Sequence, residues 1–258
     1  MDEQHQTELA LAKERLTKVS IAASLANLLG TPLDAAMERL PPAARHQVNQ
    51  VTHKALEQAL GAALFTLSNH PRAPSDRLHK AAAVATGAAG GALGLPALSI
   101  ELPISTTIML RSIADIARSE GEDMQSPAAR LSCLEVLALG GSTPTDDAAE
   151  TGYFALRASL AMAVSDAAKH LAAHGITNTG SPALVALITK IAARFSVNVS
   201  QKLAAQAVPA IGAAGGAIIN SVFMDHFQNA AHGHFVIRRL ERIYDPATVQ
   251  DHYKARLS

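Results

Sequence analysis

The chain contains little of what extracellular, sheet-rich or nucleic-acid-binding proteins depend on. Its 258 residues include one cysteine, Cys133, so no intrachain disulfide can form and a reducing compartment is expected. Tryptophan is absent and only three tyrosines occur, while alanine and leucine dominate the apolar content, which favours helices over strands. Basic and acidic residues are equal at 22 each, so the net charge attracts no nucleic acid, and none is expected as a partner.

The sequence also lacks the motifs of common enzymes. It has no Gly-x-Ser-x-Gly turn, no phosphate-binding Gly-Lys-Ser/Thr loop, no dinucleotide fingerprint and no His-Glu-x-x-His pair. The N-terminal segment shows no basic stretch followed by an apolar stretch, so no secretory signal is expected. Cys133 lies inside an apolar helical pattern and is expected to be a small core residue. No motif predicts a catalytic activity or a cofactor.

What is present is helical periodicity interrupted by glycine and proline, which predicts an all-α fold of eight or nine helices in a globular bundle. Asp147 and Glu150 have the spacing of a capping box at the start of one helix, and the proline-containing segment 68–74 is the clearest linker. We expect an N-terminal helical extension (1–44), a main helical domain (45–245) and a C-terminal tail (246–258). The expected helical segments are 3–29, 43–68, 75–100, 104–120, 127–139, 147–174, 182–203 and 204–244.

Two segments of the same sequence, GAAGGA, occur at 87–92 and 212–217, and similar charges flank both. Lys80 and Glu101 bracket 20 uncharged residues, and Lys202 and Asp225 bracket 22. Either run is long enough to cross a bilayer. However, the first run has only five Val, Leu, Ile or Phe residues, and no Trp or Tyr belt flanks either run, so a transmembrane pair is the less favoured interpretation.

The glycines of these segments need a physical reason, since four glycines in one helix cost on the order of 4 kcal/mol relative to alanine. The favoured interpretation is a central pair of Gly/Ala-rich helices packed glycine face to glycine face, because both segments have Gly-xxx-Gly spacing. The functional alternative is a smooth groove for an acyl chain, or a surface that enters lipid. The ligand-binding or helix-packing candidates are Gly87, Gly90, Gly91, Gly94, Gly212, Gly215 and Gly216.

Several polar residues lie in apolar surroundings and are expected to form a buried polar network. Glu101 is expected near a helix N-terminus that Pro103 starts, where the helix dipole favours a carboxylate. Arg111 and Asp115 are four residues apart, which predicts an ion pair. Glu135 lies within an apolar run and would need a partner, a proton or a metal if buried. The predicted network comprises Glu101, Arg111, Asp115, Glu135, Asn220 and Asp225.

A metal site is an alternative use of the same carboxylates. Asp225, Gln228 and His232 are spaced to share one helical face. Carboxylates and histidines from several helices can bind metal ions inside a bundle, although the usual Glu-x-x-His pairs are missing here. The candidate metal ligands are Glu101, Glu135, Asp225 and His232.

Three stretches, taken together, resemble the EcsC family: 86–123, which contains ELPISTTIMLRSIA and GED, the CLEVLALGG segment at 133–141, and 208–244, which ends in RRLERIY. EcsC proteins are bacterial, mostly helical and named for genetic association with an ABC-type exporter. The resemblance therefore implies a connection to transport at the cell envelope. It implies no reaction and no catalytic residues.

The leading hypothesis is a cytoplasmic protein, peripheral to the inner membrane, that binds membrane lipid or an apolar small molecule between the glycine-rich helices and assists an ABC-type transporter. The first rival is a metal-dependent helical enzyme built on the four candidate ligands. The second is an interaction module without catalysis that docks through a basic cluster near the C-terminus, Arg238, Arg239 and Arg242.

Overall fold

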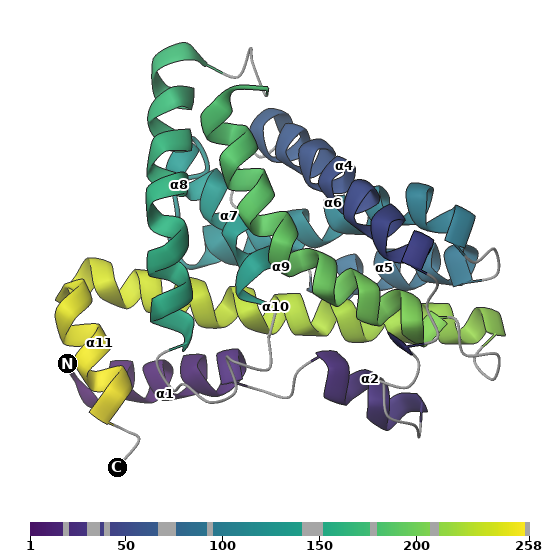
Figure 1. The fold of residues 1–258 in the computed structure, drawn as a ribbon. Helices are drawn as coiled ribbons and strands as arrows, with labels where there is room; N and C mark the ends of the chain where they lie inside the picture. The colour runs from purple at the N-terminus through teal and green to yellow at the C-terminus, as the bar shows by residue number, and fades with distance from the viewer. Residues whose placement is uncertain are drawn as a thin grey trace.

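The computed structural model describes residues 1–17, 21–29, 37–38, 42–66, 76–91, 95–140, 152–175, 180–206 and 212–255. These residues form ten helices and no strand, packed into a globular bundle (Figure 1), which confirms the predicted all-α class. The helices are α1 (Glu3–Thr17), α2 (Ile21–Leu29), α4 (Pro42–Thr66), α5 (Asp76–Gly91), α6 (Leu95–Ser119), α7 (Pro127–Leu139), α8 (Gly152–His174), α9 (Pro182–Gln206), α10 (Gly212–Tyr244) and α11 (Pro246–Ala255).

Several helix boundaries follow from local sequence as predicted. α7 and α9 each start with a proline at the first helical position, where its missing N–H costs nothing. Ser181 caps α9, since its Oγ accepts a hydrogen bond of 3.4 Å from the backbone N–H of Leu184. Asp245 separates α10 from α11 with a positive φ of 82°, and its carboxylate accepts a 2.9 Å bond from the N–H of Thr248. The residue types at these positions, two prolines, a serine and an aspartate, are readable from the sequence alone.

Other boundaries differ from the prediction. α6 begins at Leu95 and contains Pro103 in its interior, so Pro103 neither breaks this region nor starts the next helix. An interior proline costs about 3 kcal/mol, and burial of the surrounding turn offsets that cost because Leu102 and Pro103 both lie in the protein interior. The expected tail 246–258 contains α11, and the expected helix 3–29 comprises two described helices, α1 and α2. The predicted capping box lies outside the described residues.

α10 organises the bundle. It packs against α5 and α6 along one part of its length and against α1 and α11 near its C-terminal end. In Figure 1 it runs along the lower part of the molecule, with α1 below its C-terminal half and α4, α8 and α9 above. The main core takes side chains from α2 and α4 through α10, and a smaller core joins α1, α10 and α11 around Tyr253. α10 therefore links both cores.

Candidate functional site

α5 and α10 lie antiparallel, which brings the two GAAGGA segments to the same end of the bundle. Lys80 on α5 pairs with Asp225 on α10 at 2.7 Å. Two turns further along α5, the Cα of Gly87 faces the backbone of Gly216, so closely that a Cβ at Gly87 would lie 2.4 Å from the Gly216 carbonyl oxygen. At this one position the two backbones approach closely enough that only glycine fits.

Four helix ends meet near this contact. α5 ends at Gly91, α6 begins at Leu95, α9 ends at Gln206 and α10 begins at Gly212. We call this part of the molecule the glycine end; it lies at the right of Figure 1. Among the other candidate glycines, Gly215 and Gly216 are buried. Gly94 lies outside the described residues, and the burial of Gly90, Gly91 and Gly212 is not described. A central Gly/Ala-rich pair as a whole stays a prediction.

A buried ion pair lies at the glycine end. Lys202 of α9 donates a 2.6 Å hydrogen bond from Nζ to Oε1 of Glu101 on α6, and the two side chains are only 1% and 5% exposed. Burial lowers the pKa of Lys202 and the charge of Glu101 opposes that shift only in part. Nζ also lies 5.4 Å from the ring centroid of Phe223, so an aromatic face stabilises the ammonium group on another side.

Asn220 of α10 completes this group of side chains. Its Nδ2 donates to the same Glu101 Oε1 at 2.9 Å and to the backbone oxygen of Ala83 at 2.8 Å. A Cβ at Gly87 would lie 2.6 Å from this Nδ2, so only glycine at that position leaves room for the amide. We call Glu101, Lys202 and Asn220 the glycine-end triad. The glycine therefore serves a specific cross-helix hydrogen bond as well as backbone packing.

Two buried amide atoms, one on Asn220 of the triad and one on Gln206 of α9, have no hydrogen-bond partner. They are Oδ1 of Asn220, an acceptor, and Nε2 of Gln206, a donor. Gln206 follows Lys202 by four residues on α9 and so lies on the same helical face, one turn closer to the glycine end. Unpartnered buried polar atoms are uncommon because each costs about 1–3 kcal/mol.

Three large apolar side chains that lie close to the triad in sequence are exposed. Ile100 and Ile104 of α6 flank buried Glu101 and are 69% and 47% exposed, and Ile218 of α10, two residues before Asn220, is 46% exposed. The hydrogen bond between Glu101 and Asn220 holds these parts of α6 and α10 together. The glycine end thus places exposed isoleucines next to a buried, charged interior.

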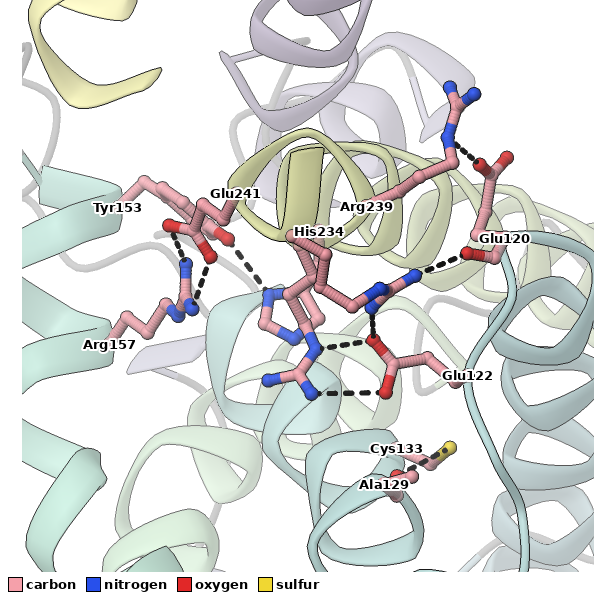
Figure 2. Close-up of polar contacts among 11 residues, drawn as sticks. Glu120, Glu122, Ala129, Cys133, Tyr153, Arg157, His234, Arg239 and Glu241 are labelled. Carbon is pink, nitrogen blue, oxygen red and sulfur yellow. Dashed lines mark hydrogen bonds and ion pairs between the residues drawn. The ribbon is translucent and has the colours of Figure 1, made fainter. Parts of the chain in front are cut away.

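A second buried polar cluster surrounds the C-terminal half of α10 (Figure 2). Gly121 ends α6 with φ 80°, and the N–H of Glu122 donates back to the Ala117 oxygen at 3.0 Å, a turn that directs Glu122 toward α10. Its carboxylate accepts bonds of 2.8 and 3.0 Å from Arg238 and a further bond from Arg242. Burial alone would raise the pKa of Glu122, but the two guanidinium groups outweigh it and the pKa is lowered.

The same cluster joins α8 to α10. Arg157 makes a bidentate pair with Glu241, with both N–O distances 2.7 Å, and the Tyr153 hydroxyl lies 2.9 Å from Nδ1 of His234. Burial and then the charges of Arg238 and Arg157 hold the pKa of His234 well below its usual range, so the imidazole is neutral. Its Nε2 is buried without a partner. We call these residues, with Glu122, the arginine cluster.

Glu135 of α7 is buried beside this cluster, as the sequence predicted. Burial raises its pKa to about 7, while the charges of Arg157 and Arg238 limit the rise. One of its oxygens, Oε1, has no hydrogen-bond partner. Glu135 can therefore exchange a proton near neutral pH, which sets it apart from Cys133 on the same helix, whose pKa burial raises to about 12.

The candidate metal ligands are not brought together. Glu101 pairs with Lys202 and Asp225 with Lys80, because a cation lies opposite each carboxylate. His232 contacts Asp76 at 3.1 Å on α5, and Glu135 lies beside the arginine cluster. Within the described ranges no three His, Cys, Asp or Glu side chains are placed to hold a metal ion. The geometry does not support the metal-dependent alternative.

Two other sequence expectations need correction. Asp115 pairs with His79 at 2.9 Å and with Arg118 at 2.7 Å, whereas Arg111 is exposed, so the predicted pair of Arg111 with Asp115 does not form. The reason is that Asp115 faces α5, which lies on the other side of the helix from solvent. The basic docking cluster is also internally paired: Arg238 and Arg242 bind Glu122, and Arg239 binds Glu8 and Glu120 at 2.7 and 2.9 Å.

Several site residues were not singled out from the sequence. Lys202 was noted only as a charge flanking an apolar run, and its lone position on the apolar face of α9 was the available signal. Glu122, the α8 pair Tyr153 and Arg157, and His234 come from three separate segments of the chain, and nothing in the sequence indicates that these segments meet. Only the packing of α7, α8 and α10 reveals their proximity.

The fold and these two clusters define the chain as an all-α bundle protein with buried ion pairs at both ends of its longest helix. It belongs to the EcsC protein family, which it matches over residues 3–240, including the N-terminal helix α1. No curated protein and no solved structure matches the chain. By length and composition one helix of the described part, α9, could cross a membrane, but this is weak evidence, since 44% of its most apolar window is buried as in an ordinary core helix.

Proposed function

We propose that the protein acts at the cytoplasmic face of a bacterial membrane, where its glycine end binds lipid or an apolar small molecule. The exposure of Ile100, Ile104 and Ile218 at this end carries the proposal. Exposed isoleucines cost free energy in water, and each one buried in an apolar environment gains about 2 kcal/mol. A lipid surface or an acyl chain supplies that environment.

The EcsC family supports a role beside an ABC-type exporter, because the family is named for that genetic association. The chain carries no ATP-binding motif, so it would be an accessory of the transporter. Under this proposal the glycine end contacts the bilayer next to the transporter, and the rest of the bundle stays on the cytoplasmic side.

Flotation of detergent-free protein with liposomes tests the proposal. Neutral phosphatidylcholine vesicles measure apolar insertion, and vesicles with added phosphatidylglycerol show what anionic charge contributes. We expect flotation on both, and a drop of more than tenfold in the bound fraction when Ile100, Ile104 and Ile218 are all changed to Gln.

A matched control uses exposed apolar residues far from the glycine end. Met162 of α8 and Val185 near the start of α9 are also well exposed. Val185 lies 21 residues before the end of α9, and thus about 30 Å from the glycine end. The double variant Met162→Gln/Val185→Gln should float like the unmodified protein. Equal losses in both variants, or no flotation of the unmodified protein on either vesicle, would overturn the proposal.

A further inference from the structure

Helix α5 is covered by α10 on one side and exposed on the opposite side. Lys80 pairs with Asp225 of α10, and the Cα of Gly87 faces the α10 backbone. Leu78 and Ala85 each lie two residues before one of these contacts, about 200° around the helix, and both are exposed. Leu78 is 69% exposed, as much as Ile100.

Helix α6, which packs beside α5, is exposed on a corresponding side. Glu101 and Ser112 form hydrogen bonds with Asn220 and Gln228 of α10. The residues that precede them, Ile100 and Arg111, point about 100° away from these contacts and are exposed. Exposed Ile104 shares their side of the helix, since it lies one turn after Ile100 and two turns before Arg111. We call the following residues the α5–α6 face: Arg77, Leu78, Ile100, Ile104 and Arg111.

The two arginines of this face flank one contact between the helices. His79 of α5 lies 2.9 Å from Asp115 of α6. Arg77 precedes His79 by two residues, and Arg111 precedes Asp115 by one turn. Both arginines are exposed, and neither side chain makes an ion pair or hydrogen bond with any residue that the structure describes.

The α5–α6 face carries no acidic residue to balance these arginines. Every carboxylate of the two helices has a partner elsewhere: Asp76 contacts His232, Glu101 pairs with Lys202, and Asp115 pairs with His79 and Arg118. By contrast, α1, α4 and α8 each expose an acidic residue, namely Glu3, Glu57 and Asp166. An anionic surface is therefore attracted to the α5–α6 face more than to those helices.

We propose that the α5–α6 face docks on the headgroups of an anionic phospholipid bilayer, with Arg77 and Arg111 binding lipid phosphates. This inference rests on the proposed function, because it names the lipid class that meets the same end of the molecule. Apolar side chains of a peripheral helix enter about 5–10 Å into the boundary between headgroups and acyl chains. Arg111 lies seven residues after Ile104, or about 10 Å along α6, so inserted isoleucines place it at the level of the phosphates.

Flotation on two kinds of vesicle tests the headgroup contact. One is phosphatidylcholine alone, and the other contains phosphatidylglycerol. Each basic residue near an anionic surface strengthens binding about fivefold, so we expect the protein to bind the anionic vesicles about twentyfold more tightly at low salt. That gain should disappear in about 0.5 M NaCl, since salt screens exposed charges.

The variant Arg77→Gln/Arg111→Gln should lose the gain and bind both vesicles within about twofold of each other. Its melting temperature should not change, because neither side chain has a partner in the described part of the chain. The matched control is Lys169→Gln/Lys254→Gln, which removes the same charge from exposed positions on α8 and α11. Those helices pack mainly against α7 and α9, and against α1 and α10, so the control should keep most of the gain.

The outcomes separate this inference from the proposed function. Equal binding of the unmodified protein to both vesicles, with flotation that depends on the isoleucines, would overturn the headgroup contact and leave apolar insertion standing. Equal losses in the arginine variant and the lysine control would overturn the headgroup contact too. Anionic binding that the arginine variant loses and the isoleucine variant keeps in full would support the headgroup contact and overturn apolar insertion.

Discussion

Glu101 and Lys202, which lie 101 residues apart in sequence, form a 2.6 Å ion pair in the interior of the bundle. Lys80 and Asp225 form a second pair at 2.7 Å, 145 residues apart. These four residues are the charges that bracket the two uncharged GAAGGA-containing runs. The charge that ends one run thus pairs with the charge that begins the other. The antiparallel arrangement of α5 and α10 accounts for the pair of Lys80 with Asp225, whereas Glu101 and Lys202 meet across α6 and α9.

The buried pair of Glu101 and Lys202 predicts that removing one charge destabilises the protein more than removing both. Lys202→Met leaves the Glu101 carboxylate buried without a cation, and we expect it to lower the free energy of unfolding by about 3–5 kcal/mol. Adding Glu101→Gln removes that charge and should restore part of the loss. Urea unfolding of both single variants and of the double variant measures the coupling. Additive losses would show that the two side chains act independently.

The surroundings of Gly87 and Gly61 predict that alanine destabilises the protein at the first position and stabilises it at the second. Gly87→Ala places a methyl group 2.4 Å from the Gly216 oxygen and should destabilise the protein by about 1–3 kcal/mol. Gly61 lies inside α4 with no atom within 4 Å of a Cβ, so Gly61→Ala should stabilise the protein by up to about 1 kcal/mol. Thermal unfolding of the two variants should show shifts of opposite sign. A stabilised Gly87→Ala would contradict the close packing of α5 on α10.

Glu135 predicts a pH-dependent stability that one substitution removes. Its pKa is about 7 in the folded protein, above the ordinary value of 4.5. The contribution of its protonated form to the free energy of unfolding is therefore fully present below pH 4.5 and is lost as the pH rises through 7. The loss amounts to about 3 kcal/mol. Glu135→Gln should unfold like the unmodified protein at pH 4.5 and at a higher urea concentration at pH 8. A constant difference between the two proteins across this range would refute the assignment.

Glu122 predicts the opposite dependence on pH. Its pKa is lowered by Arg238 and Arg242, so its stabilising contribution is present above pH 4.5 and is lost as the pH falls through its folded-state pKa. Glu122→Gln should therefore cost most at neutral pH and little in acid. The cost at neutral pH should reach about 3–5 kcal/mol, since two guanidinium groups lose their counterion. Urea midpoints of the variant at pH 3.5 and 7 provide the measurement.

The helical architecture was readable from local sequence to a large extent. Pro127, Pro182 and Asp245 mark helix starts or junctions where the structure has them. Pro103 misled the prediction, because its effect on a helix depends on how well the neighbouring turn is buried, and that burial comes from α4, α5 and α10 packing around α6. The helical character of 246–255 was missed since its short apolar pattern becomes stable only where Val249 and Tyr253 enter the smaller core.

The candidate sites were readable only in part. The sequence identified Glu101, Asn220 and Glu135 as polar residues in apolar surroundings, and the structure shows all three buried. Their partners could not be inferred, because an ion pair depends on which side chains meet across helices and not on the spacing within one. For that reason Asp115 binds His79 and Arg118, although Arg111 has the favourable spacing.

By itself the sequence determined the all-α class, the position of most helices and the two glycine-rich segments, because helix propensity, capping and apolar periodicity are local properties. The tertiary structure alone decided which charges neutralise one another, which amides remain without partners and which isoleucines stay exposed. Burial and cross-helix distance set the energies of these groups, and both arise only when segments more than 100 residues apart, such as those carrying Glu101 and Lys202, pack together.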